Sequence, residues 1–210
     1  MFKKLEEKSE AQEQPKESGQ LVLPSDLRIL GLYGEIEEGK ALHAIGFLID
    51  YSETRILTPK DESDPESELI ETIPPVEVLI STPGGNADDM FAIYDVMRVV
   101  REKCDVVTYG IGKVMSAGVL LLAAGTKGQR KIGKHCRVMI HSVVAGSAGS
   151  FHNLENEMEE IRNTQDAYIK ALAKETKMTP SKIRKLVDKK VNIYLSAQEA
   201  VELGIADIII

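Results

Sequence analysis

The feature that most constrains the fold of this chain is an alternation of short apolar runs with longer segments of helical periodicity. The apolar runs predict β-strands at residues 29–34, 76–81, 105–111, 137–141 and 205–210. The segments between and after them predict helices at residues 41–51, 86–100, 116–124, 151–177, from Thr179–Pro180 onward, and 196–204. Regular alternation of this kind is typical of an α/β domain with a parallel sheet and right-handed crossovers. The sequence therefore predicts an α/β fold built from repeated βαβ units.

Two stretches of the 210-residue chain depart from this pattern. Residues 1–20 are polar and lack periodicity, which predicts a flexible N-terminal arm ahead of a single domain over residues 21–210. Residues 58–72 are acidic and contain two prolines. We expect this second stretch to be a solvated insertion loop, with a loop that binds another protein as the alternative.

The composition argues against several functional classes. The formal net charge is −7 and no concentrated basic region is present, so we expect no binding to nucleic acid. The N-terminal residues contain no apolar signal-peptide core, and no apolar run approaches the roughly 20 residues of a membrane span. Cys104 and Cys136 have neither the number nor the spacing of a disulfide framework or a zinc site, so no metal is expected. Unpaired thiols suit a reducing compartment, and we expect a cytoplasmic protein with no membrane attachment.

A serine lies at one predicted junction between a strand and a helix, in Gly112–Gly118 (GKVMSAG). Backbone N–H groups at the start of a helix have no partner within the helix. Ser116 in this position could attack a carbonyl group while neighbouring N–H groups stabilise the oxyanion. The arrangement is similar to a nucleophile elbow, although the segment lacks the G-x-S-x-G pattern. Taken alone, it also fits a serine that only packs within a helix of small residues.

Two further segments follow predicted strands. Gly84 and Gly85 come after the strand at 76–81, where they could admit a ligand close to the backbone or form an ordinary turn. His141 ends the strand at 137–141 and is better placed for catalysis than the other three histidines. The carboxyl ends of parallel strands gather at one edge of a sheet. We therefore expect the glycine pair, the serine and the histidine to meet in one active site.

These segments resemble those of ClpP, the proteolytic subunit of the Clp protease. The family's motifs S-P-G-G, A-I-Y-D, M-A-S-M-G-A, L-L-A-A-G-x-K-G-x-R, V-M-I-H and L-S-A-x-E-A-x-x-x-G-x-x-D correspond, in this order, to residues 82–85, 92–95, 114–119, 121–130, 138–141 and 195–207. The resemblance extends from about residue 27 to the C-terminus. It implies the ClpP/crotonase-like α/β fold, in which a long helix, here at 151–177, protrudes as a handle used for contact between rings.

Carried over residue by residue, the resemblance implies a serine endopeptidase. Ser116 would be the nucleophile and His141 the general base. The N–H groups of Gly85 and Ala117 would form the oxyanion hole. Ser116 would take the acyl group of a bound peptide, and water would then release it from the enzyme.

The family's third catalytic residue departs from the pattern. It is an aspartate three residues before the L-S-A motif, and this position holds Asn192. An asparagine oxygen can accept a hydrogen bond from the imidazole and hold the ring, but it carries no negative charge to stabilise an imidazolium. Asp188 lies four residues earlier and is the alternative. The position in the motif favours Asn192.

The resemblance also implies a substrate groove lined by Gly84 and Val143. Val143 and Ala145 replace a proline and a glycine of the family, in a stretch that lines the groove and leads to the contact between rings. Residues 58–72 stand where the family has a short connection. This insertion could alter the docking of an ATPase or one contact between subunits.

Assembly and partners are likewise implied by the resemblance. It implies a homo-oligomer, with seven-membered rings stacked as a 14-mer, that cleaves peptides and unfolded proteins. The chain contains no G-x-x-x-x-G-K-[ST] motif, so ATP would be used by a partner AAA+ unfoldase of the ClpX or ClpA type, and the chain itself would need no cofactor. Two alternatives stay open. One is a weakly active or inactive structural subunit of a mixed ring, and the other is a crotonase-like acyl-CoA enzyme.

Overall fold

The computed structural model describes residues 27–61, 63–64, 66–189 and 191–210, so the predicted arm at 1–20 lies outside the described residues. The helices are α1 (Glu38–Glu53), α2 (Ala87–Val100), α3 (Ala117–Ala123), α4 (Phe151–Glu175), α5 (Pro180–Val187) and α6 (Ala197–Glu202). The strands are β1 (Ile29–Tyr33), β2 (Ile56–Pro59), β3 (Leu69–Thr72), β4 (Val76–Thr82), β5 (Val106–Met115), β6 (Arg130–Ile132), β7 (Arg137–Ile140), β8 (Ile193–Leu195) and β9 (Ile208–Ile209).

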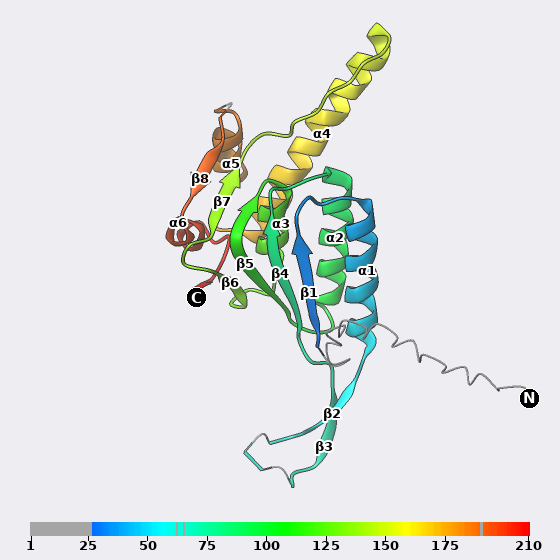
Figure 1. The fold of residues 1–210 in the computed structure, drawn as a ribbon, viewed down its shortest axis with the longest axis vertical. Coiled ribbons are helices and arrows are strands. Elements are labelled where there is room, and N and C mark those ends of the chain that lie inside the picture. The colour runs from blue at the N-terminus through cyan, green and yellow to red at the C-terminus, as the bar shows by residue number, and fades with distance from the viewer. Residues whose placement is uncertain (1–26, 62, 65, 190) are drawn as a thin grey trace, which may run out of the picture.

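The main sheet is mostly parallel (Figure 1). Strands β1, β4, β5, β6 and β9 lie side by side in this order, and each neighbouring pair is parallel. β7 is parallel to the second half of β5, whereas β8 is antiparallel to β7. Helices α1, α2 and α3 pack against one another in sequence beside β1, β4 and β5. This arrangement confirms the predicted α/β class.

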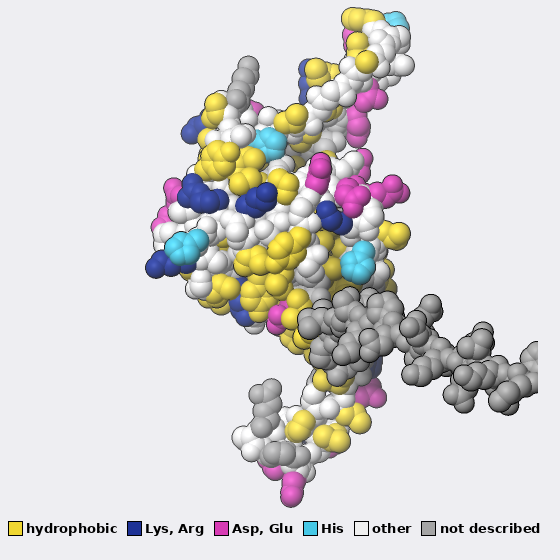
Figure 2. Space-filling model, in the orientation of Figure 1, with side chains coloured by type: hydrophobic (Ala, Val, Ile, Leu, Met, Phe, Trp, Pro, Cys, Tyr) yellow, Lys and Arg dark blue, Asp and Glu magenta, His cyan; other side chains and the backbone are white. Residues whose placement is uncertain are grey.

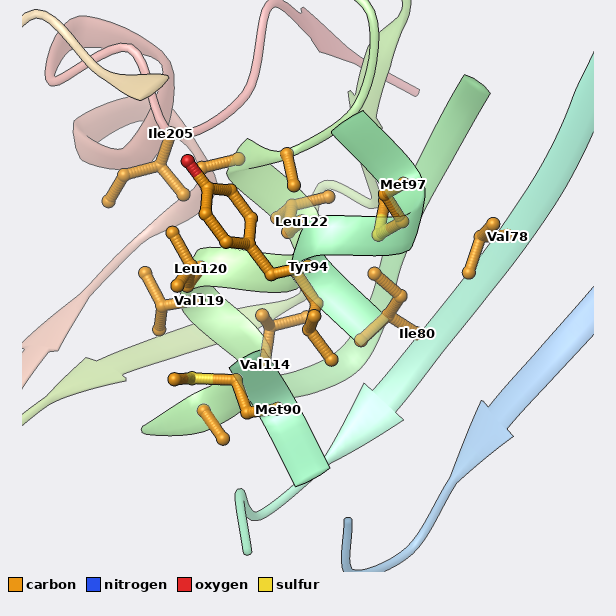
Figure 3. Packing of buried hydrophobic residues seen from close by; sticks show 14 of the residues in the cluster. Val78, Ile80, Met90, Tyr94, Met97, Val114, Val119, Leu120, Leu122 and Ile205 are labelled. Carbon is orange, nitrogen blue, oxygen red and sulfur yellow. The ribbon is translucent and has the colours of Figure 1, made fainter. Parts of the chain in front are cut away.

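The core lies between the sheet and helices α2 and α3. Buried residues of α2 recur at helical spacing, which gives the helix one apolar face. Figure 3 shows Tyr94 and Met97 of this face among Leu120 and Leu122 of α3, with Ile80 of β4 nearby. α3 is buried along its whole length. Full burial of each such aliphatic side chain contributes about 1.5–3 kcal/mol, and this packing fixes α3 against the sheet.

β5 is longer than the prediction of residues 105–111. Its first half pairs with β4 and β6, and its end, Lys113–Met115, pairs with β7. The strand continues past the predicted end because its partner on one side changes from β6 to β7, which pairs with its last residues up to Met115. The extra length places Ser116 directly after the last paired residue.

The long helix α4 projects from the body, as the resemblance implied (Figure 1). Its buried residues are confined to the C-terminal part and are Tyr168, Ile169, Leu172 and Glu175. The N-terminal part is exposed, including Phe151 and Met158. Only the last turns of α4 therefore belong to the core.

The acidic segment at 58–72 corrects the sequence prediction of a loop. Its ends belong to β2 and β3, which form an antiparallel two-stranded sheet of their own. The hydroxyl groups of Thr58 and Thr72 are 3.2 Å apart across this pair. These strands contain Ile, Leu and Thr, which favour β-structure, but they are short and the acidic residues between them dominate the composition of the segment. In Figures 1 and 2 this hairpin projects from the end of the molecule opposite α4.

Three helices, α2, α5 and α6, begin where the sequence predicts that they begin. The side chain of Asn86 accepts hydrogen bonds from the N–H groups at the start of α2, and Thr179 does the same for α5. Ser196 and Glu199 form a capping box at α6. These local signals depend on residues close in sequence, so they are readable without the tertiary structure.

Candidate active site

Ser116 occupies a strained turn between β5 and α3. Its backbone angles are φ 53° and ψ −120°, and it is the only non-glycine residue with positive φ in the described part of the chain. Its N–H donates to the carbonyl of Met139 in β7 at 2.8 Å. Its carbonyl accepts from the N–H of Val119 at 3.0 Å and from the hydroxyl of Tyr168 at 3.2 Å. Strain held in this way at a strand-to-helix turn is the geometry of a nucleophile elbow.

Gly84 lies directly behind this turn. Its φ is +109°, and a Cβ atom at this position would lie 2.5 Å from Ser116 Cβ and 3.0 Å from Ser116 Oγ. The residue is buried and is absent from the lining of the cavity described below, contrary to the expectation that it lines the groove. The close approach of Ser116 leaves no room for a side chain at position 84.

Two backbone N–H groups remain available beside Ser116. Gly85 forms an isolated bridge with Ile36, in which the Ile36 N–H donates to Gly84 and the Asn86 N–H donates to Ile36. This pattern leaves the Gly85 N–H without a hydrogen-bond partner among the described residues. The N–H of Ala117, at the start of α3, has none there either. Both residues line the same cavity as Ser116. Unpaired N–H groups are the kind of donor that can stabilise an anionic oxygen.

His141 follows β7 immediately. Because Met115 is paired with Met139, the strand ends bring His141 beside the Ser116 turn. The imidazole is partly buried, and this burial lowers the pKa of His141 below its ordinary value of 6.5. A histidine with a lowered pKa is neutral at physiological pH, as a general base must be. The remaining histidines are all exposed: His43, His135 and His152.

A cavity of about 430 Å³ joins these groups. Its lining contains Ser116, Ala117, Gly85 and His141. The apolar part of its wall includes Met90, Phe91, Val143, Val144, Ile161 and Tyr168. Val143, the residue predicted to line a substrate groove, lies in the wall of this cavity. Its N–H donates to Gln165 Oε1 of α4 at 3.3 Å, which ties the segment after His141 to that helix.

Asn192 precedes β8. The β7–β8 ladder pairs Ile140 with Ile193, so Asn192 stands one residue beyond this pair, on the side of His141. Asn192 is exposed. Asp188 is exposed as well and ends α5, outside this ladder. Within the described residues, no hydrogen bond joins His141 to Ser116 Oγ, to Asn192 or to Asp188.

The sequence analysis missed the contributions of α4 to this site. Tyr168 and Gln165 come from the helix predicted at 151–177, which the resemblance implied only as a projecting handle. One signal was available: a tyrosine in an apolar stripe brings a hydroxyl group into the core, and such a group requires a partner. The identity of that partner, the Ser116 carbonyl, follows only from the fold.

The described residues also bear on metal binding and on membrane insertion. They contain no group of three His, Cys, Asp or Glu side chains arranged to hold a metal ion. No helix among them has the length and apolar character needed to cross a bilayer.

Comparison with known proteins agrees with this geometry. Residues 68–210 match the family model described as Clp protease. The chain is 39% identical over 137 residues to the ATP-dependent Clp protease proteolytic subunit 2 of Prochlorococcus marinus (strain NATL2A), a match that covers 65% of this chain and 66% of that protein. It is 31% identical over 183 residues to the ATP-dependent Clp protease proteolytic subunit 4 of Rhodococcus jostii (strain RHA1), which covers 87% and 84% of the two chains. These matches favour the peptidase over the crotonase-like alternative. The chain therefore belongs to the Clp protease family, the family of ClpP-type serine endopeptidases.

Proposed function

We propose that this chain cleaves peptide bonds through an acyl-enzyme formed on Ser116, with His141 as general base. The observation that carries the proposal is the strained Ser116 turn, which faces the same cavity as a partly buried histidine and two unpaired N–H groups. An apolar wall beside these groups suits a segment of unfolded polypeptide, whose apolar side chains are accessible.

The reaction begins when His141 removes the proton from Ser116 Oγ as the oxygen attacks the peptide carbonyl. The negative charge that develops on the carbonyl oxygen is stabilised by the N–H groups of Gly85 and Ala117. His141 then gives the proton to the leaving amine, and the peptide C–N bond breaks. Water, activated by the same histidine, hydrolyses the ester and restores Ser116. None of these steps requires a metal ion or an organic cofactor bound to this chain.

Asn192 is our candidate for the residue that orients His141. The register of β7 and β8 supports Asn192 over Asp188. If the pairing of Ile140 with Ile193 is continued by one residue, Asn192 stands opposite His141. An amide oxygen there could accept from the imidazole N–H and hold the ring.

We further propose that the chain acts as an assembled ring. The projecting, partly apolar α4 would contact a second ring, and seven-membered rings would stack as a 14-mer. An AAA+ unfoldase of the ClpX or ClpA type would use ATP to deliver protein substrates. Both cysteines are free and buried, which suits the reducing cytoplasm.

A fluorophosphonate probe tests the proposal, because it labels only an activated serine. We expect intact-mass labelling of the full-length chain and its loss in Ser116→Ala. We also expect labelling to slow strongly in His141→Ala, whereas His43→Ala serves as a control because that histidine is exposed on α1.

Two other results would overturn the proposal. Labelling that persists in Ser116→Ala would assign the reactive serine elsewhere. An assembled protein that labels only after Asn192→Asp would support the structural-subunit alternative.

A further inference from the structure

The hydroxyl group of Tyr168 makes a contact that the proposed mechanism does not use. It donates a hydrogen bond to the backbone carbonyl of Ser116 at 3.2 Å. Tyr168 is only 7% exposed and belongs to the buried end of α4. The contact therefore links the base of the projecting helix to the turn that carries the nucleophile.

The carbonyl of Ser116 and the N–H of Ala117 belong to the same peptide unit. This unit is planar and trans, so its C=O and N–H bonds point in opposite directions and cannot rotate independently. A hydrogen bond that fixes the carbonyl oxygen therefore also fixes the direction of the N–H. The Ala117 N–H is one of the two proposed oxyanion donors, and Ala117 lines the same cavity as Ser116.

We infer that Tyr168 is a positioning residue for the reaction, which aims and polarises the Ala117 N–H through the Ser116 carbonyl. This inference rests on the proposed oxyanion hole. A donor bound to the carbonyl oxygen draws electron density from the amide, so the N–H at the other end becomes a stronger donor. The effect is greatest when negative charge develops on the substrate oxygen, and it therefore favours the transition state over the bound substrate.

The surroundings of Tyr168 fit this role. Burial raises the pKa of the Tyr168 hydroxyl, which consequently stays protonated and able to donate throughout the physiological range. The Val119 N–H also donates to the Ser116 carbonyl, at 3.0 Å, as part of the first turn of α3. Without Tyr168, the Ser116 carbonyl would be held only by α3 itself, through Val119. Tyr168 holds it from a second element, which restricts rotation of the peptide unit.

The Tyr168 ring also lines the cavity, so its two contributions must be separated. Tyr168→Phe keeps the ring and the cavity wall and removes only the hydroxyl group. Tyr94→Phe is the matched control, since Tyr94 is another buried tyrosine whose hydroxyl donates to Glu175 at 3.0 Å, outside the cavity lining. Both variants lose one buried hydrogen bond, but only the first loses contact with the Ser116 turn.

The test measures kcat and KM with a fluorogenic peptide, together with the affinity for a peptide boronic acid, whose serine adduct is tetrahedral. For Tyr168→Phe we expect kcat to fall about three- to tenfold, the range set by loss of one neutral hydrogen bond. Boronate affinity should fall by the same factor, with KM unchanged to within about twofold. Tyr94→Phe should lower thermal stability and leave all three constants near those of the unmodified protein.

Several outcomes would overturn the inference. A rise in KM with unchanged kcat would assign the hydroxyl to substrate binding, and equal losses in both variants would assign it to stability. If Ser116→Ala retains activity, the proposed function itself fails. In that case, crystal structures of the unmodified protein and of Tyr168→Phe provide the test. An unaltered orientation of the Ser116–Ala117 peptide in Tyr168→Phe would contradict the positioning role of Tyr168.

Discussion

His141 and Asn192 stand at the same level of two antiparallel strands, each one residue beyond the pair formed by Ile140 and Ile193. The two residues are 51 positions apart in the sequence and come together only because β8 returns beside β7. Because of this placement, a substitution at position 192 is the direct way to change the orientation and the pKa of the His141 imidazole.

Asn192→Asp tests that placement. A carboxylate beside the imidazole would hold the ring in the correct tautomer and stabilise the imidazolium. The reverse change in another serine protease lowered the rate by about 10⁴-fold, so we expect a gain of roughly 10- to 100-fold in kcat/KM at neutral pH. Asp188→Asn is the matched control and should leave the rate unchanged. If neither kcat nor the labelling rate increases in Asn192→Asp, then Asn192 does not belong to the site.

The pH dependence of the same pair has a defined sign. The base must be neutral, so activity falls as the pH drops through the pKa of His141. Burial lowers this pKa below 6.5, and the acid limb of kcat/KM should therefore have its midpoint below pH 6.5. A negative charge at position 192 would raise the pKa of His141 and move the limb to higher pH. If the acid limb of kcat/KM has the same midpoint in Asn192→Asp as in the unmodified protein, the proposed contact between position 192 and His141 is contradicted.

Gly84→Ala should disable the nucleophile without unfolding the protein. The added methyl group would lie 2.5 Å from Ser116 Cβ, at a φ of +109° that disfavours any side chain. The Ser116 turn must shift, and misplacement by about 1 Å costs roughly 10²-fold in rate. We expect a loss of this size in fluorophosphonate labelling. Gly46→Ala, on α1 with no atoms near the added methyl group, is the control and should label normally.

Glu175 is the centre of a buried ion-pair network at the end of α4. It is 2% exposed and accepts two hydrogen bonds from Arg101, at 3.0 and 3.1 Å, and one from Tyr94. Lys127 lies 3.3 Å from the carboxylate. Glu175→Gln leaves these cations without a counter-charge, so the free energy of unfolding should fall by about 3 kcal/mol. Denaturant titration measures this change, and Glu159→Gln on the exposed part of α4 should have no effect.

The network also predicts how stability depends on pH. Burial by itself raises the pKa of Glu175, but Arg101 and then Lys127 and Tyr94 outweigh it, and the pKa lies below the ordinary 4.5. A carboxyl group with a lowered folded-state pKa stabilises the protein above pH 4.5, and this contribution is lost as the pH falls through the lower value. The Glu175→Gln variant should lack this part of the acid sensitivity. Equal acid sensitivity in both proteins would assign it to other groups.

The β2–β3 hairpin should be separable from the rest of the fold. Its strands contact chiefly each other, and a two-stranded sheet alone is only marginally stable in water. Replacing residues 56–72 by a short glycine-containing turn should leave the thermal midpoint within about 3 °C and peptide cleavage unchanged. A large fall in either would show that the hairpin supports the core or the cavity.

Most of the fold was predictable because its signals are local. The buried strand β4, the cap at Asn86, the break before Pro180 and the capping box at Ser196 all depend on residues a few positions apart. The misassigned parts depend on pairing at longer range. β5 extends to Met115 because β7 pairs with its end, and the three-residue strand β8 exists only as a partner of β7. The hairpin escaped prediction because its strands are four residues each and flank an acidic turn.

The sequence by itself determined which chemistry this protein carries: a serine at the start of a helix, a histidine at the end of a strand, and the motifs that connect them to the Clp proteases. Only the tertiary structure decided how these groups are held. Gly84 lies close against Ser116, and the hydroxyl group of Tyr168 donates to the Ser116 carbonyl from another helix. Asn192 stands opposite His141, one residue beyond the last pair of β7 and β8. The physical reason is that local sequence sets backbone preference and capping. Contacts between distant segments, in contrast, depend on strand register and helix packing, which exist only once the whole core has formed.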